Sequence, residues 1–403
     1  MQEGLDKMDG SDKSDGVRRG VRLATAVWLL GSATLAAHLL TANGYGMFRD
    51  EFYYIACSKR LAFVYVDQPP LSILILAALR ALFGNSLVSL RFLPGVAHAA
   101  VVVLFGMIAR ELGAGRFGQA FAALSAAVMP ILLGVSSFYS MNPFDALFWA
   151  VCVYVLCRIF NTQNARLWLL FGIVAGFGLL NKFSVGFLGL ALPVGLLFSR
   201  QRNHFLSPYL SAGGAGAFLI FLPHVLWQLQ HDLITLEFMH NAAQHKNSPT
   251  DPFKYFLDQV LVAHPLLVPV WLVGIVYGLR AEAMRPFRPF AIMFVGLFFF
   301  FSLTRGKSYY LAPAYALVVP AGALALERLT HERFTWMRPV AFVVATLGGL
   351  ALAPLAVPLL PVERLIAYQN ALGVGNIKEE VGHGAPLNQH FADRFGWKEF
   401  ADE

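Results

Sequence analysis

The chain has 403 residues, of which 57% are hydrophobic and only 14% charged, and its formal net charge is +7. An ordinary soluble domain has about 25% charged residues, so this composition excludes a string of soluble domains and predicts a helical membrane body. The Arg and Lys residues form short clusters between apolar runs rather than one basic face, which argues against nucleic acid as a partner. The 3 cysteines show neither a CxxC motif nor a zinc-ligand spacing, so no disulfide framework or structural metal is expected.

The first twenty residues are polar and of mixed charge, and arginines precede an apolar run from Leu23 to about Leu40. This order predicts a cytoplasmic tail over residues 1–20 followed by a signal anchor. A cleaved signal peptide is the alternative, but its apolar region usually has only about 7 to 15 residues.

Apolar runs recur as far as residue 360. They cover residues 21–41, 71–83, 91–109, 117–137, 144–160, 167–180, 183–199, 206–228, 264–279, 289–304, 309–326 and 338–360. The connections richest in arginine are assigned to the cytoplasm, and this requires the short run 71–83 to stay outside as a re-entrant or juxtamembrane helix. We therefore predict an all-α membrane protein whose domain over 21–360 has about eleven transmembrane helices.

The same assignment places the polar connections outside. They are the first loop 42–70, the short loops 138–143 and 305–308, the long loop 229–263 and a tail over 361–403. In the first loop Phe48, Phe52 and Ile55 have helical spacing, which predicts an amphipathic helix along the membrane surface. Function is expected in these outer segments.

Carboxylates beside hydrocarbon are costly unless they have a purpose or a partner. Adjacent Asp50 and Glu51 in the first loop would point about 100° apart on a helix. One reading makes one of them a general base and its neighbour an orienting group or a ligand of a divalent ion. The other reading pairs them with Arg49 and Lys59 on a solvated face.

Two further acidic residues begin helices. The turn Asp67-Gln68-Pro69-Pro70 is extended before its prolines and could aim Asp67 inward, although a helix-start signal explains it equally well. Asp145 lies in the first turn of a predicted span, where a negative charge complements the helix dipole.

Cations and tyrosines occur where outer loops meet hydrocarbon. They are Lys182, His245, Lys246, Lys307, Tyr309 and Tyr310, with His240, Gln244 and Arg305 nearby. A lipid phosphate needs such donors while its tail stays in the membrane. Anchoring of the protein at the membrane interface is the competing interpretation.

Several sequence pieces together resemble one family. They are RDEFYYIA, YVDQPPL, SLRFLPG, ARELG, MNPFDALFWA, GLLNKFSVGF and KSYYLAPAYALVVPAGALALER, in this order. Across about residues 20 to 400 the chain resembles bacterial dolichyl-phosphate-mannose protein mannosyltransferase-like proteins of the GT-C glycosyltransferase class, family 39. The resemblance implies a GT-C bundle in the bacterial inner membrane, a polyprenyl-phosphate sugar as donor, and inverting transfer to a periplasmic glycan, lipid or protein.

The resemblance also implies roles for individual residues. The presumed base of the first outer loop matches Asp50, with Glu51 beside it, and the acidic residue before the proline pair matches Asp67. The stretch from Ala243 to Lys246 is similar to a phosphate-binding loop of the aminoarabinose transferases, and Lys307 and Tyr310 match the family's KxxY position.

Two features depart from the family's pattern. Gln68 stands where relatives often have Lys or His, which removes one phosphate contact. The tail motif NQHFADRFGWKEFADE is similar to the start of a longer periplasmic region, so the chain is expected to be either naturally short or truncated. A transporter or flippase and an inactive protein that binds lipid-linked sugar therefore stay open as alternatives, and the sequence names neither sugar nor acceptor.

Overall fold

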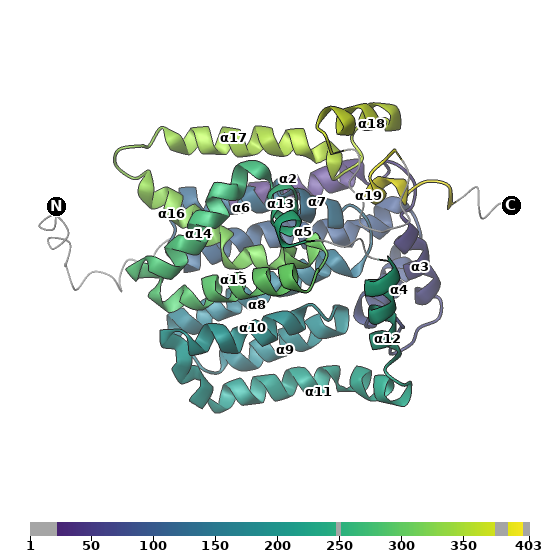
Figure 1. The fold of residues 1–403 in the computed structure, drawn as a ribbon, viewed down its shortest axis with the longest axis horizontal. Helices are drawn as coiled ribbons and strands as arrows, with labels where there is room; N and C mark the ends of the chain where they lie inside the picture. Colours follow the sequence, from purple (N-terminus) through teal and green to yellow (C-terminus); the bar gives the residue numbers. More distant parts are fainter. Residues whose placement is uncertain (1–21, 247–250, 375–385, 398–403) are drawn as a thin grey trace, which may run out of the picture.

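The structure is a computed structural model that describes residues 22–246, 251–374 and 386–397. The predicted cytoplasmic tail over residues 1–20 lies outside the described residues. All regular secondary structure in the described ranges is helical, and the helices form an elongated bundle (Figure 1). The expected all-α fold is confirmed.

Long helices run along the bundle and coincide with the apolar runs of the sequence. They are α2 (Thr25–Thr41), α5 (Leu87–Glu111), α6 (Arg116–Ala127), α8 (Met141–Thr162), α9 (Leu167–Asn181), α10 (Val185–Leu197), α11 (Pro208–Gln230), α14 (Val268–Arg280), α15 (Arg288–Leu303), α16 (Val319–Leu329) and α17 (Met337–Leu352). Within the described ranges five helices are long and apolar enough to cross a membrane, or seven if two bent helix pairs each count as one span. The chain is thus a multi-pass membrane protein, and the number of eleven spans stays a prediction.

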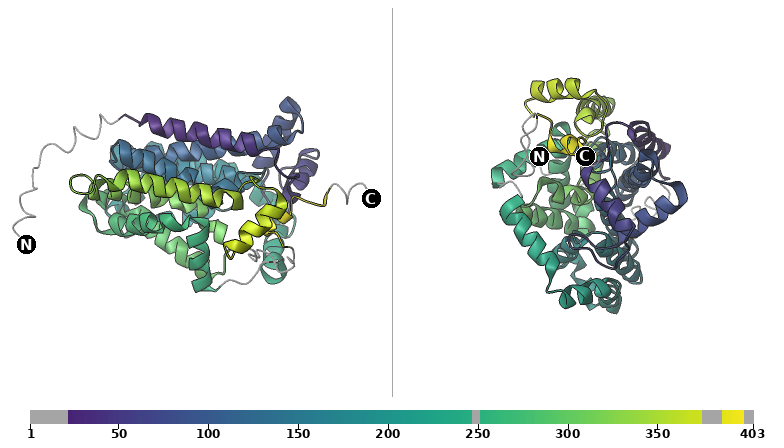
Figure 2. Two further views of the ribbon diagram at one scale, coloured as in Figure 1. Left: turned by 90° about the horizontal axis from the view of Figure 1, so that it is seen from above. Right: turned by 90° about the vertical axis from the view of Figure 1, so that its right-hand side faces the viewer.

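Short elements gather at one end of the bundle (Figure 1). They are α3 (Arg49–Ser58), α4 (Leu71–Phe83), α7 (Pro130–Val135), α12 (Ile234–Asn241), α18 (Val362–Ala371) and α19 (Gln389–Ala392). Helix α4 packs on α3, so the run 71–83 lies at this end together with the first loop. Looking onto this end, Figure 2 shows the yellow C-terminal elements close to the purple first-loop elements.

The long outer loop is partly helical. Its second half forms α13 (Pro252–Val262), which is followed by η4 (Pro265–Leu267) and α14 after a bend of 99°. Asp251 caps α13 by accepting bonds from the backbone N–H groups of Phe253 and Lys254. Although residues 252–262 belong to the predicted outer loop, they build part of the packed end of the bundle.

The arginine-rich connections lie at the opposite end of the bundle. They join α5 to α6, α8 to α9, α10 to α11, α14 to α15 and α16 to α17, and Figure 1 shows the last of these far from α3 and α19. One end of the bundle therefore carries the arginine-rich connections and the other end carries the short helices. Such a difference in charge is expected of a protein with one fixed orientation in the membrane.

The core consists of large apolar side chains between these helices. Trp149 of α8 and Trp168 of α9 are almost completely buried, and small residues let helices approach closely elsewhere. A Cβ atom on Gly172 of α9 would lie 2.0 Å from the carbonyl oxygen of Gly213 on α11. Close contact through small residues is how helices pack without a hydrophobic driving force between them.

Candidate active site

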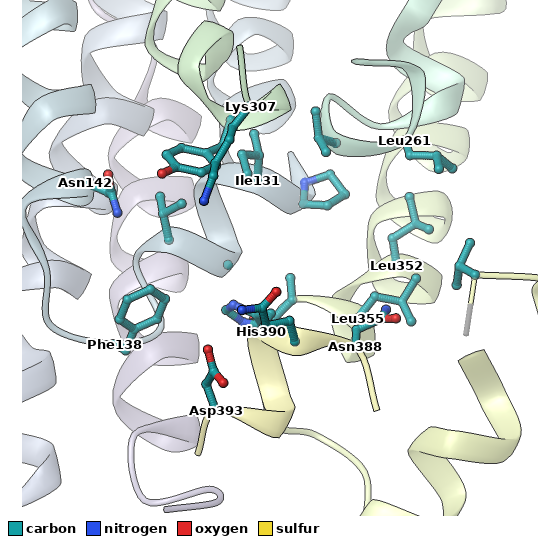
Figure 3. A pocket seen from close by; sticks show the side chains of 18 of the residues that line it. Ile131, Phe138, Asn142, Leu261, Lys307, Leu352, Leu355, Asn388, His390 and Asp393 are labelled. Carbon is teal, nitrogen blue, oxygen red and sulfur yellow. The ribbon is translucent and has the colours of Figure 1, made fainter. Parts of the chain in front are cut away.

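A cavity of about 450 Å³ lies at the end of the bundle that carries the short elements. Its wall combines the first turn of α3, helix α7, the start of α8, the ends of α13 and α17, the 3-10 helix η6 (Ser308–Leu317) and helix α19. The polar and charged residues in this wall are Arg49, Asp50, Asn142, Lys307, Tyr309, Asn388, Gln389, His390 and Asp393. Figure 3 shows Lys307 and Asn142 facing this space from one side and His390 and Asp393 from the other.

Asp50 is the first-loop carboxylate that reaches the cavity. It lies in the first turn of α3, and its side chain is 43% exposed. Its Oδ1 atom is 3.5 Å from Nε of Arg49. Adjacent residues on a helix point about 100° apart, so the orientation of Asp50 follows from that of Glu51, which faces the protein interior.

Glu51 is buried in a polar network that fixes the start of α3. Its Oε2 atom is 2.8 Å from Nη2 of Arg91 on α5, and Nε of Arg91 donates to Oε1 at 3.0 Å. The backbone N–H groups of Phe48 and Tyr139 donate to the same carboxylate at 2.8 and 2.9 Å. Each carboxylate oxygen therefore accepts two bonds, which suits a group that holds the helix in place.

These contacts argue against a divalent ion held by Asp50 and Glu51 together. A carboxylate oxygen that already accepts two hydrogen bonds has little capacity left for a metal ion, so Glu51 does not fit as a ligand. Across the described ranges, no group of three or more His, Cys, Asp and Glu residues could hold a metal ion.

Lys182 forms a second polar cluster directly behind the cavity wall. Its Nζ atom donates to Oδ1 of Asn142 at 2.8 Å and lies 3.5 Å from Oδ2 of Asp145. It also lies over the rings of Tyr309 and Tyr310, at 5.2 and 5.7 Å from their centroids. Asn142 and Tyr309 line the cavity, so the Lys182 ammonium is one side chain away from it.

Asp145 is the buried counterion of this cluster. It is almost completely inaccessible, and it accepts a hydrogen bond from Ser184 in addition to its contact with Lys182. A buried carboxylate needs such partners because the cost of removing its charge from water is large. The sequence motifs MNPFDALFWA and GLLNKFSVGF thus meet in space.

Other predicted site residues lie away from the cavity wall. Asp67 accepts a hydrogen bond from Oη of Tyr53 at 2.6 Å, and burial together with this bond raises the pKa of Tyr53. Gln68 is buried and its Nε2 atom has no partner among the described residues. His245 is exposed in the π-helical turn Ala242–Lys246, and the side chain of Lys246 lies outside the described part of the structure.

Sequence analysis predicted no function for the C-terminal residues that line the cavity. Asn388, Gln389, His390 and Asp393 lie on or beside α19, in the tail motif whose meaning the sequence left open. The dense mixture of polar and aromatic residues in NQHFADRFGW is the sequence signal that could have indicated a packed segment.

The C-terminal segment is expected to become less firmly docked in acid. Burial and the neighbouring Arg394 lower the pKa of His390 to about 3, whereas a free histidine has a pKa near 6.5. Between these pH values the undocked segment binds a proton that the docked segment does not, so docking weakens as pH falls below about 6.5, by at most about tenfold per pH unit. Hydrogen exchange over residues 386–397, corrected for intrinsic rates, measures this effect.

The control for this experiment is His390→Gln, which keeps a side-chain donor for the carbonyl of Ala356, 3.0 Å from the histidine ring. In the His390→Gln variant, the hydrogen-exchange protection of residues 386–397 should change much less between pH 7.5 and pH 5. Equal pH dependence in both proteins would contradict the assignment to His390.

Known proteins are similar to this chain over much of its length. Residues 67–227 match the family model described as dolichyl-phosphate-mannose-protein mannosyltransferase. An undecaprenyl phosphate-α-4-amino-4-deoxy-L-arabinose arabinosyl transferase of Pseudomonas aeruginosa is 28% identical over 320 residues, which is 72% of this chain and 56% of that protein. A lipid A galacturonosyltransferase of Rhizobium johnstonii is 24% identical over 220 residues, covering 53% of this chain and 45% of that protein.

Solved structures share the fold. ArnT from Cupriavidus metallidurans, bound to undecaprenyl phosphate, aligns with a TM-score of 0.67 and 18% identity over 86% of this chain and 68% of that chain. The chain is therefore similar to dolichyl-phosphate-mannose-protein mannosyltransferases over residues 67–227 and shares its fold with ArnT. An oligosaccharyltransferase from Archaeoglobus fulgidus aligns with a TM-score of 0.54 and 13% identity, over 80% of this chain and 54% of that chain.

The resemblance expected from the sequence motifs is thereby confirmed, and so is the GT-C fold. The chain spans about half of the length of the curated relatives that it matches, 56% in the case of the arabinosyl transferase. The roles of individual residues stay predictions.

Proposed function

We propose that the chain is an inner-membrane glycosyltransferase that transfers a sugar from a polyprenyl-phosphate donor to a periplasmic acceptor, with inversion at the anomeric carbon. One observation carries this proposal: a single cavity is lined by the Asp50 carboxylate together with Lys307 and Tyr309, and Lys182 lies directly behind it. Such a transfer needs a general base for the acceptor hydroxyl and donors that bind the departing phosphate.

The names of related proteins support the donor class. The Pseudomonas relative is named for an undecaprenyl phosphate-linked sugar, and the Cupriavidus structure holds undecaprenyl phosphate. The Rhizobium relative is named for lipid A. Undecaprenyl-phosphate sugars and lipid A are therefore the first donor and acceptor to test with this chain.

The charge distribution supports a periplasmic site. The arginine-rich connections lie at the end of the bundle opposite to the cavity, and such connections remain in the cytoplasm. The cavity then opens toward the periplasm, near the membrane surface, where a lipid head group and a periplasmic acceptor can both reach it.

In the proposed reaction the acceptor hydroxyl attacks the anomeric carbon from the face opposite to the lipid phosphate. A bond from the acceptor oxygen to this carbon forms, the bond from the carbon to the phosphate oxygen breaks, and Asp50 accepts the hydroxyl proton. Lys307 and Tyr309 stabilise the charge that grows on the departing polyprenyl phosphate, supported by Lys182. The departing polyprenyl phosphate, a phosphate monoester, is a good leaving group without protonation, so no general acid is required.

The proposal is tested by the lipids of a strain that lacks the gene. A polyprenyl-phosphate sugar should accumulate in the deletion strain, as measured by mass spectrometry of the lipid extract. The wild-type gene should remove it, and the Asp50→Asn gene should not. A deletion strain with an unchanged profile of lipid-linked sugars would refute the proposed function.

Lys307→Gln is expected to weaken the binding of undecaprenyl phosphate by about 10- to 100-fold, because a hydrogen bond to a charged group contributes about 1.5–3 kcal/mol. Lys307 lines the cavity at the start of η6, and glutamine keeps most of its length without the charge. Titration of the purified protein with undecaprenyl phosphate in detergent measures the change.

Lys254→Gln is the matched control, because Lys254 is 51% exposed and pairs with Asp258 on the surface of α13. It should bind undecaprenyl phosphate as the wild type does. Wild-type affinity in Lys307→Gln would contradict a phosphate contact at this position.

A further inference from the structure

The C-terminal segment, residues 386–397, is packed firmly against the first loop. The backbone N–H of Arg49 donates to the carbonyl of Asp393 at 2.8 Å. A Cβ atom on Gly46 would lie 2.3 Å from the carbonyl oxygen of Arg394, so the two backbones are in close contact. Phe391 is fully buried and its ring lies edge-on to that of Tyr45.

Arg394 fixes the same segment to the bundle. Its Nη2 atom donates to Oγ of Ser137 at 2.6 Å, and its guanidinium lies 5.8 and 5.6 Å from the ring centroids of Phe138 and Phe391. The side chain is 2% exposed. The segment is therefore anchored by backbone, aromatic and cationic contacts that do not involve the carboxylate of Asp393.

The carboxylate of Asp393 meets Arg49 at the cavity wall. Nη2 of Arg49 is 3.4 Å from Oδ2 of Asp393 and Nε is 3.5 Å from Oδ1 of Asp50. One guanidinium thus lies between two carboxylates, and all three residues line the cavity. Both separations exceed the length of about 2.7–2.9 Å that a close charge-assisted hydrogen bond has.

We propose that Asp393 is a positioning residue of the site, which shares the Arg49 guanidinium and so keeps Arg49 from pairing closely with Asp50. This inference rests on the proposed function. A bidentate guanidinium occupies the oxygens of a carboxylate and stabilises its charged form, so an Asp50 in such a pair would be a poorer proton acceptor. Asp393 preserves the basicity of Asp50 from the far end of the chain.

The geometry accounts for the position of Asp393. The hydrogen bond from the Arg49 N–H to the Asp393 carbonyl sets the two residues side by side. Their side chains then meet at the cavity rather than elsewhere on the surface, and the Asp393 side chain is only 17% exposed. An ion pair with restricted geometry and limited exposure is more effective than one on an open surface.

The test is a double-mutant cycle in proteoliposomes that contain lipid A. The donors are undecaprenyl-phosphate esters of 4-amino-4-deoxy-L-arabinose and of galacturonic acid, and the readout is the release of undecaprenyl phosphate. Asp393→Asn should lower kcat at least tenfold with a donor KM within about threefold of wild type, and Asp393→Glu should restore much of the loss. In an Arg49→Gln background, Asp393→Asn should cause no further loss, because the guanidinium that it restrains is gone.

Three outcomes would overturn the inference. Wild-type kcat in Asp393→Asn would show that the carboxylate is not needed. The same fold loss with and without Arg49 would show that Asp393 acts by another route. Loss of hydrogen-exchange protection over residues 386–397 in Asp393→Asn would show that the carboxylate holds the segment in place instead of Arg49.

These experiments distinguish a failure of this inference from a failure of the proposed function. A folded wild-type protein that releases no undecaprenyl phosphate from either donor, in a deletion strain without accumulated lipid-linked sugar, would refute the proposed function itself. An active wild type with an equally active Asp393→Asn would refute the inference alone. Asp258→Asn on α13, in a surface ion pair, is the control and should keep wild-type kcat.

Discussion

The Asp50→Asn variant is expected to transfer sugar about 10²- to 10⁴-fold more slowly than the wild type, the usual contribution of a general base. Asparagine has nearly the same shape, but its amide cannot accept the proton of the acceptor hydroxyl. The donor KM should change little, because the proposed phosphate contacts, Lys307 and Tyr309, come from another element of the cavity wall than Asp50.

Its position in the fold makes Asp50 a better candidate for the general base than Glu51, Asp145 or Asp67. Glu51 has its carboxylate saturated by Arg91 and two backbone N–H groups, and Asp145 is buried beside Lys182. Asp67 accepts a hydrogen bond from Tyr53 and does not line the cavity. Asp50 lines the cavity and is partly exposed to it.

Initial rates in proteoliposomes with saturating donor measure this effect. Asp258→Asn provides the matched control, since it removes an equivalent carboxylate from a surface pair. Turnover in Asp50→Asn close to that of the control would mean that another group accepts the proton.

Arg91→Met is expected to cost about 3–5 kcal/mol of the free energy of unfolding, because it leaves the buried Glu51 carboxylate without its counterion. Arg91 is 2% exposed and also donates to the carbonyls of Ala42 and Gly46, at 2.6 and 2.8 Å. The variant therefore loses the link between the end of α2, the start of α3 and α5.

Unfolding by SDS in mixed micelles measures this loss. Adding Glu51→Gln to Arg91→Met should recover part of the stability, since the uncompensated buried charge is then removed. Lys254→Met, which breaks the exposed pair with Asp258, should cost at most about 1 kcal/mol. A loss in Arg91→Met no larger than in this control would contradict a structural role of the pair.

The sequence predicted the helices, and it indicated several residues of the candidate site, because both depend on local signals. Apolar runs set the helix positions, and polar residues at their outer ends indicated Asp50, Lys182, Lys307 and Tyr309. Helix packing then brought these residues to one end of the bundle. His245 carried the same kind of signal, but it lies in an exposed turn away from the cavity wall.

Long-range contacts could not be predicted in this way. Asp50 and Glu51 are chemically alike, and only the approach of Arg91 from α5 shows which of them turns inward. The cavity wall formed by His390 and Asp393 depends on a contact between segments at opposite ends of the sequence. Polar loop residues have no periodic pattern that would reveal such a contact.

The hydrogen bond between Arg49 and Asp393 also sets an order of events during biosynthesis. Proteins are synthesised from the N-terminus, so α3 is made long before its partner segment leaves the ribosome. The nascent chain can insert its bundle and still lack one side of the pocket. Only translation through Asp393 completes that pocket, so the wall that α19 supplies is the last part of it to be made.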